Sequence, residues 1–323
     1  MKELDEFEII KSIQRTLGNK KFASEDVEIF RIGKRNMVVK IDTLVQSTDI
    51  PPKMRLEDAV RKSIVACISD FAAKGVKPKF GVISLNLPKA VSRSKIMEIA
   101  RGIKKTSDEF EVKILGGDTN EGKEIVFHVC IFGETEKIIA RKGAKTGDVV
   151  FVTGPFGLTG IGLQVLLQNK RGRKEFVKRC QEAVFKPNPR LEFGLKCKKY
   201  FSSAMDSSDG LSTTLNEMAR QSNHKFVIKT IPASKEVYDF AKLNKTDPMD
   251  LIFNAGEEYE FVFTAPKKYR TSIQRLASKS KTPVIEIGHV TRGSGVYIQN
   301  DKLFRLKDAG WRHFKKNNYS PEK

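Results

Sequence analysis

Five aspartates of this chain occupy positions where a folded protein rarely leaves a charge unpaired: Asp42, Asp70, Asp118, Asp206 and Asp209. They lie at the ends of predicted strands, on a predicted helix or in glycine-containing turns. Burying a carboxylate costs several kcal/mol unless it is paired or binds a metal. Mg²⁺ prefers octahedral oxygen ligands and usually combines a few carboxylates with substrate phosphates. The pattern therefore predicts a site that holds Mg²⁺ against a polyphosphate.

The strongest of these signals is the segment 204–212, in which a short apolar strand runs into Asp206 and Asp209 and then into a helix. Helix capping explains Asp209, because Asp is favoured at the N-cap. It does not explain Asp206, since two close carboxylates repel each other unless a cation lies between them. We therefore expect metal binding in this segment.

Asp70 and Asp118 each have an ordinary alternative. Asp70 lies near the edge of an apolar helix stripe and would be unremarkable if exposed, although its place in the last turn favours a nearby cation. Asp118 follows Gly116 and Gly117, which suit either a plain turn or a close approach to a ligand. Neither residue predicts a metal site by itself.

Other catalytic chemistries have little support in the sequence. The histidines show no metal-ligand spacing, and none neighbours a serine or cysteine nucleophile: His128, His224, His289 and His313. Zinc and triad chemistry are therefore disfavoured. Neither a Walker lysine motif nor a kinase catalytic-loop signature occurs.

Composition places the chain among globular proteins. Its 323 residues, 39% apolar and 30% charged, allow two domains of ordinary size. No signal peptide or membrane span is expected, and the cysteines, which lack CxxC spacing, predict reduced thiols in a cytosolic protein: Cys67, Cys130, Cys180 and Cys197. The net charge of +20 is spread along the chain, so we interpret it as a charged surface that attracts anionic substrates, with nucleic-acid binding as a minor alternative.

Strand and helix patterns alternate in both halves of the chain. In the first half, the helix 56–74 carries an apolar stripe and ends at Gly75, and the segment 116–122 is expected to be a loop between two strands. A polar segment at 140–148 marks a boundary. The pattern predicts an α+β protein with two domains, 1–145 and 146–323, each a mixed or antiparallel sheet with helices on one face.

Five motifs occur in an order typical of one enzyme family. They are Asp42-Thr43-Leu44-Val45, the block 69–78 (SDFAAKGVKP), Gly116-Gly117-Asp118-Thr119, Ser208-Asp209-Gly210-Leu211 and Gly256-Glu257-Glu258-Tyr259-Glu260. The series resembles thiamine-monophosphate kinase, above all its archaeal branch, in the aminoimidazole ribonucleotide synthetase superfamily. The resemblance covers residues 20–315. It implies a cytoplasmic homodimer whose first-domain sheets meet in a barrel-like interface, with ATP in a cleft between the two domains of the chain.

The resemblance also implies roles for individual residues. The Mg²⁺ ligands would be Asp26, Asp42, Asp70, Asp118, Asp206 and Asp209. ATP would contact Gly117, Asp118, Arg141 and Ser208, and the catalytic residues would be Asp209 and Arg141. The thiamine side would be lined by Asp49, Glu257 and Trp311.

The chain departs from the family pattern at three places. Ser24 replaces a glycine before the acidic pair Glu25-Asp26, and Glu258 replaces a commoner aspartate. Asp49 stands where many members carry a substrate-contacting histidine, so its carboxylate would either face the cationic thiazolium or admit a different substrate.

The expected reaction is a direct, in-line transfer of the γ-phosphate of ATP to thiamine monophosphate. A phosphate monoester is already ionised at neutral pH, so the reaction needs alignment of two anions by Mg²⁺ and Arg141 and no general base. The alternatives are another ATP-using member of the superfamily, such as a synthetase-like cyclase or a carbamoyl-dehydrating maturation enzyme, and a basic protein that binds nucleic acid.

Overall fold

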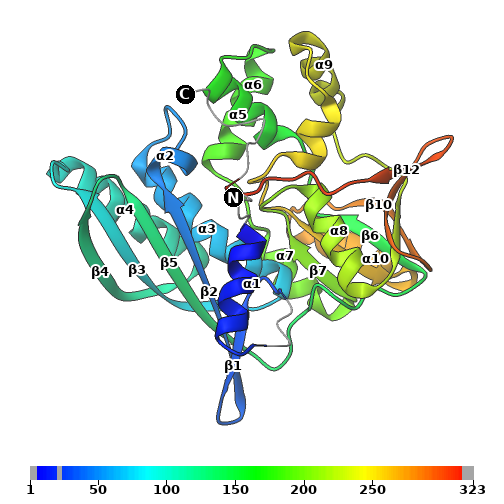
Figure 1. The fold of residues 1–323 in the computed structure, drawn as a ribbon, viewed down its shortest axis with the longest axis horizontal. Coiled ribbons are helices and arrows are strands. Elements are labelled where there is room, and N and C mark those ends of the chain that lie inside the picture. The colour runs from blue at the N-terminus through cyan, green and yellow to red at the C-terminus, as the bar shows by residue number, and fades with distance from the viewer. Residues whose placement is uncertain (1–5, 20–23, 315–323) are drawn as a thin grey trace.

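The computed structural model describes residues 6–19 and 24–314, and its strands form two separate sheets, one in each half of the chain (Figure 1). The domain boundary that we propose, between residues 145 and 146, falls between these two sheets. Among the described helices, none is both long and apolar enough to cross a membrane. The two sheets with their helices have the predicted α+β architecture.

The N-terminal sheet has the strand order β1-β2-β5-β3-β4. Its strands are β1 (Glu28–Ile32), β2 (Arg35–Val45), β3 (Pro78–Pro88), β4 (Lys113–Gly122) and β5 (Val126–Thr135). Only β3 and β4 pair in parallel, so the sheet is mixed, as predicted. The core lies on the face that carries α3 (Leu56–Lys74) and α4 (Arg93–Phe110). Two further helices are α1 (Glu6–Thr16) and α2 (Gln46–Asp49).

Our prediction of a loop at 116–122 is wrong, because this segment belongs to β4. The glycines allow an unusually close approach of two strands: a Cβ on Gly117 would lie 1.7 Å from the carbonyl oxygen of Ile83 in β3. Glycine usually indicates a turn in sequence, but here the pairing with β3 imposes an extended backbone.

The C-terminal sheet has the order β12-β11-β8-β10-β6-β9-β7 and is also mixed, with only β8 and β11 parallel. Its strands are β6 (Asp148–Val152), β7 (Ser203–Asp206), β8 (Lys225–Ile228), β9 (Phe261–Pro266), β10 (Ile285–Thr291), β11 (Gly295–Gln299) and β12 (Leu303–Leu306). The helices are α5 (Leu158–Gln168), α6 (Lys174–Phe185), α7 (Leu191–Cys197), α8 (Leu211–Ser222), α9 (Lys235–Asn244) and α10 (Arg270–Lys279), with the π-helix η2 (Asp250–Asn254).

Helices cover both faces of the C-terminal sheet, whereas we expected them on one. Val150 and Val152 of β6 belong to the core under α5, α6, α8 and α9. The intervening Val149 and Phe151 belong to a second core with α7 and α10. The reason is visible in β6, where every residue is buried, as is typical of a strand covered on both sides.

Helix α3 links the two domains. It begins at Leu56 and ends at Lys74, as predicted, and Gly75 follows in the left-handed region with φ of 64°. Ile64 and Ile68 belong to the N-terminal core, while Ala72 and Ala73 belong to the core beneath the C-terminal sheet. The last turn of α3 is therefore enclosed by both domains.

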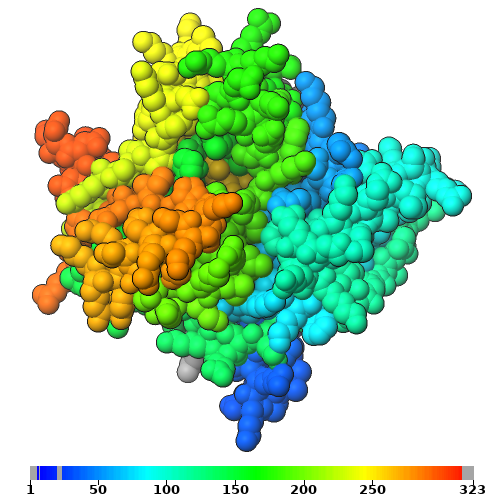
Figure 2. Space-filling model, turned by 180° about the vertical axis from the view of Figure 1, so that it is seen from behind, coloured from blue at the N-terminus to red at the C-terminus, as the bar shows by residue number. Residues whose placement is uncertain are grey.

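The first hairpin stands apart from this packing. Figures 1 and 2 show the hairpin of β1 and β2 (blue) projecting from the body of the molecule, and every residue of β1 is exposed. The exposed residues include Ile29, Phe30 and Ile32, so this hairpin presents apolar surface to its surroundings.

The close contact between α3 and α7 gives a test of the domain junction. A Cβ on Gly194 would lie 2.1 Å from the carbonyl oxygen of Ala72, so Gly194→Ala should force the two helices apart. We expect the free energy of unfolding to fall by about 1–3 kcal/mol in urea denaturation, although alanine favours a helix. Lys196→Ala, at a half-exposed side chain of the same helix, is the control. An unchanged or higher stability of Gly194→Ala would contradict this packing.

Candidate active site

Three buried carboxylates from distant parts of the chain converge between the domains. Asp26 precedes β1, Asp70 lies on α3 and Asp206 ends β7, and each is at most 3% exposed. One carboxylate oxygen of each lies within 4.8 Å of the others. Within the described residues, this is the one group of three or more acidic, histidine or cysteine side chains close enough to share a metal ion.

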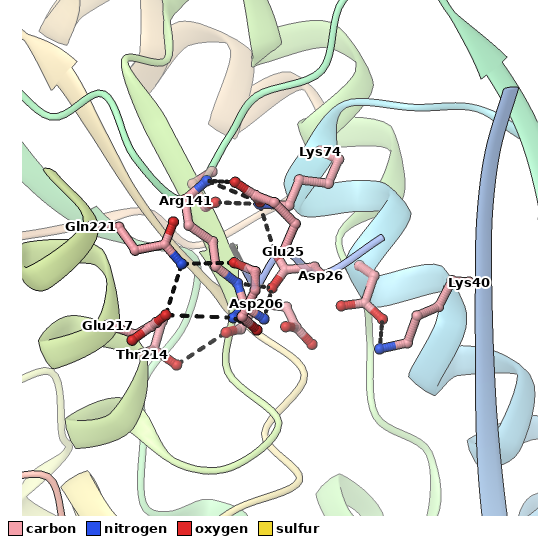
Figure 3. A network of polar contacts seen from close by, with 12 residues as sticks. Glu25, Asp26, Lys40, Lys74, Arg141, Asp206, Thr214, Glu217 and Gln221 are labelled. Atoms are coloured by element: carbon pink, nitrogen blue, oxygen red, sulfur yellow. Dashed lines mark hydrogen bonds and ion pairs between the residues drawn. The ribbon is translucent and has the colours of Figure 1, made fainter. Parts of the chain in front are cut away.

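Asp26 is held by two cations (Figure 3). The Nζ atom of Lys74 lies 2.6 Å from Asp26 Oδ2, and Arg141 Nε donates to Asp26 Oδ1 at 2.6 Å. Glu25 joins them, because its carboxylate accepts from the Arg141 backbone N–H and lies 2.9 Å from Lys74 Nζ. Arg141 also donates to Ser24 Oγ at 3.0 Å. These bonds tie the segment before β1 to the junction.

Asp70 and Asp206 have fewer positive neighbours. Lys40 Nζ lies 2.9 Å from Asp70 Oδ2 and 3.5 Å from Asp42 Oδ2. Asp206 Oδ2 accepts a hydrogen bond from the hydroxyl of Ser69 at 2.8 Å. Because β2 alternates its side chains, Lys40 and Asp42 share the face of the sheet that packs on α3.

The pKa values of the three carboxyl groups differ accordingly. Burial, followed by the charge of Asp26, raises the pKa of Asp206 to about 6. Burial also raises the pKa of Asp70 well above its ordinary value, although Lys40 opposes this shift. At Asp26 burial again acts to raise the pKa, but Lys74 and Arg141 outweigh it and lower the value. Two cations compensate the charge of Asp26, whereas Asp70 and Asp206 have the single charge of Lys40 close to them.

The charges of this group suit a divalent cation. The carboxylates are Glu25, Asp26, Asp42, Asp70 and Asp206, and the cations are Lys40, Lys74 and Arg141. Five negative charges minus three positive charges leave two, which one divalent ion would neutralise. The donors are hard carboxylate oxygens, which Mg²⁺ prefers, so the residues present fit this metal.

A second polar group lies beside the first, where Glu257 meets α3. Its backbone has φ of 66°, and its N–H donates to the carbonyl oxygen of Ser208 at 2.6 Å. Its Oε1 pairs with the buried Lys62, while its Oε2 is buried and has no hydrogen-bond partner among the described residues. Lys62 Nζ also donates to the backbone oxygen of Asp49 at 2.9 Å. The carboxylate of Asp49 itself accepts from the Val45 N–H at 2.7 Å.

The segment 206–209 connects the two groups. Ser208 contacts Glu257, and the carbonyl oxygen of Asp209 accepts from the N–H of Trp311 at 2.8 Å. The side chain of Asp209 is exposed. Our N-cap interpretation of Asp209 is wrong, because Gly210, with φ of 108°, occupies the N-cap position of α8. Capping therefore explains neither aspartate of this segment.

Gly117 and Asp118 lie elsewhere on the N-terminal sheet. The strand register aligns Gly117 with Ile83 and Asp42, so Asp118 points to the opposite, outer face of the sheet. There it shares a row with Ser84, His128 and Thr43, and Thr43 Oγ1 lies 2.9 Å from His128 Nδ1. The structure thus brings Asp26, Asp42, Asp70 and Asp206 together and keeps Asp118 apart from them within one chain.

Sequence reasoning missed three lysines of the site: Lys40, Lys62 and Lys74. One signal was available, because Lys74 follows Phe71 and Asp70 by three and four residues and so continues the inward side of α3. The burial of Lys62 was harder to predict, since 14 of the 19 residues of α3 are buried and no single stripe marks the inner face.

Comparison with known proteins agrees with this geometry. The family models for the N-terminal and C-terminal domains of AIR synthase related proteins match residues 24–135 and 145–300. A thiamine-monophosphate kinase of Nitrosopumilus maritimus is 58% identical over 316 residues, which are 98% of this chain and 100% of the relative. A thiamine-monophosphate kinase of Pyrococcus horikoshii is 36% identical over 322 residues, 99% of each chain.

Among solved structures, AaThiL complexed with AMPPCP and TMP superimposes with a TM-score of 0.86 at 29% identity, covering 97% of this chain and 98% of that one. This likeness spans both domains and the junction that carries the carboxylates. The chain belongs to the thiamine-monophosphate kinase family.

Proposed function

We propose that this protein transfers the γ-phosphate of ATP to thiamine monophosphate and forms thiamine diphosphate in the cytoplasm. The observation that carries the proposal is the buried group of Asp26, Asp70 and Asp206 at the domain junction, in a chain 58% identical to a thiamine-monophosphate kinase along its whole length. That identity supports the kinase over a cyclase, a maturation enzyme or a nucleic-acid-binding protein. The complex of AaThiL with AMPPCP and TMP supports ATP and thiamine monophosphate as the two substrates.

In this proposal Asp42, Asp70 and Asp206 hold Mg²⁺, with Asp26 beside them and Asp209 as a further ligand. Asp118 lies on the outer face of the sheet and would be a ligand only across the dimer interface proposed below. Mg²⁺ would neutralise the phosphate oxygens that meet during the transfer. The bonds of Arg141 to Asp26 and Ser24 fix its guanidinium group and leave N–H donors for a phosphate oxygen. The acceptor phosphate is already ionised, so these residues align two anions and no side chain removes a proton.

We propose that the organic end of thiamine monophosphate lies against Glu257, Asp49 and Trp311, and that ATP contacts Gly117 and Ser208. The Oε2 atom of Glu257 is buried without a partner, so it can accept a hydrogen bond from an amino group of a ligand. Lys62 holds the other oxygen and thereby fixes the direction of the carboxylate.

We further propose a homodimer formed by the outer face of the N-terminal sheet. Phe30, Ile41 and Phe80 are 45%, 63% and 42% exposed there, and the strand register aligns Ile41 with Cys130 and Val82 on the same face. A contiguous apolar sheet face of this kind is rare on a monomer. A second copy of the same face would cover it symmetrically.

Asp206→Asn should lower kcat for thiamine diphosphate formation by about 10²–10³-fold, because the amide weakens Mg²⁺ binding where charge must be neutralised. Product is measured by chromatography with ATP, Mg²⁺ and thiamine monophosphate. In thermal melts without metal, the variant should be at least as stable as the wild type, since one buried repelling charge is gone, and Mg²⁺ should raise its Tm less. Asp239→Asn, on the exposed side of α9, is the control. Full activity of Asp206→Asn would refute the proposed site.

Glu257→Gln should raise the KM for thiamine monophosphate about tenfold, or ~1.4 kcal/mol, and leave the KM for ATP nearly unchanged. The amide keeps the shape of the side chain but replaces one acceptor oxygen with a donor and breaks the ion pair with Lys62. Glu192→Gln, at an exposed ion pair of α7, should leave both constants unaltered. Equal effects on the two substrates would argue against a role for Glu257 at the thiamine end.

Ile41→Lys should convert the dimer to a monomer, because it places a charge in the apolar outer face. Light scattering after gel filtration measures the mass directly. Leu243→Lys alters a similarly exposed leucine of α9 and should leave the dimer intact. A monomeric wild type, or a dimer that tolerates Ile41→Lys, would rule out this interface.

A further inference from the structure

Lys74 is an unusual member of the carboxylate group because its ammonium is completely enclosed by oxygens. Its side chain is 0% exposed. The Nζ atom lies 2.6 Å from Asp26 Oδ2 and 2.9 Å from Glu25 Oε2, and it donates to the backbone oxygen of Ala204 at 2.9 Å. The contact with Ala204 is a hydrogen bond, and the contacts with the two carboxylates are ion pairs. These three oxygens surround a positive charge much as ligands surround a metal ion.

Lys40 differs from Lys74 in this respect. Its side chain is 24% exposed, and among the described residues its ion pairs are with the carboxylates Asp70 and Asp42, the second at 3.5 Å. A lysine with a solvent-accessible, flexible stem can move aside when a stronger cation arrives. The side chain of Lys74 cannot move into solvent in this way, because both domains enclose the last turn of α3. Lys40 is therefore a replaceable cation, and Lys74 is a permanent one.

The charged residues of the group form two ends, one around Lys74 and the other around Lys40. At one end, Lys74 and Arg141 face Asp26 and Glu25, so two positive charges balance two negative ones. At the other end, Lys40 faces Asp42, Asp70 and Asp206, so one positive charge meets three negative ones. A divalent ion is needed only at the second end.

We infer that Lys74 is a built-in countercation that takes the place of a divalent ion at the Asp26 end of the group. A nitrogen of a fixed cationic side chain lies 2.6 Å from each oxygen of Asp26, so divalent ions would bind at the end formed by Asp42, Asp70 and Asp206. The inference rests on the proposed function only in that the group binds divalent ions at all. Lys74 acts by positioning charge and is not a catalytic residue.

The test counts bound Mn²⁺, a paramagnetic substitute for Mg²⁺, by electron paramagnetic resonance of the full-length protein without nucleotide. Lys74→Met frees the oxygens of Asp26, Glu25 and Ala204, so this variant should bind one more Mn²⁺ per chain than the wild type. Lys40→Met should bind the same number as the wild type with a several-fold lower Kd. Lys77→Met, at an exposed lysine close by, should match the wild type in both respects.

The inference is overturned if Lys74→Met binds the same number of ions as the wild type, or if Lys40→Met gains the additional ion instead. Should Lys74→Met be unfolded without metal, the titration is followed by circular dichroism. Folding induced by Mn²⁺ then supports the inference, and a chain that stays unfolded at saturating Mn²⁺ overturns it.

A second variant checks the ligands. In Lys74→Met combined with Glu25→Gln, Asp26 retains the balancing charge of Arg141, so the additional ion should disappear; its persistence would overturn the inference. Turnover of the wild type is assayed separately. A wild type that forms thiamine diphosphate while Lys74→Met gains no ion refutes this inference alone, and an inactive wild type refutes the proposed function.

Discussion

The mutual repulsion of buried carboxylates at the domain junction is the constraint on which the rest of the structure depends. Asp26, Asp70 and Asp206 come from three elements far apart in the chain, and each is removed from water. Such a group is stable only with enough positive charge around it. The chain supplies part of that positive charge through Lys40, Lys74 and Arg141, and in our proposal divalent ions supply the remainder.

The candidate site consists of this charged group and the neighbouring polar group at Glu257. In our proposal the first group recognises charge, which is common to all phosphates, and the second presents a directed carboxylate to the organic substrate. The segment from Asp206 to Asp209 joins the two groups, so it would hold the acceptor at a fixed position relative to the metal. Such an arrangement would combine a phosphate-binding architecture with selectivity for one acceptor.

The sequence predicted those features that depend on local patterns. The bounds of α3 and its end at Gly75 followed from periodicity, and the convergence of Asp70 and Asp206 on one group followed from the cost of burying charge. The segment 116–122 was mistaken for a loop, because its glycines serve strand pairing that only the tertiary structure reveals. The buried Lys74 was missed for a related reason. A lysine is ordinarily exposed, and the partner of Lys74, Asp26, lies 48 residues earlier in the chain.

Helix α3 has a consequence for how ligands enter. Most of the helix packs into the N-terminal core and its last turn contacts the cores of both domains, so a hinge between the domains would have to break apolar contacts of both. Opening by rigid-body rotation is therefore costly. We therefore expect ligands to enter through small local rearrangements, such as displacement of the partly exposed Lys40 side chain, while the two domains keep their relative position.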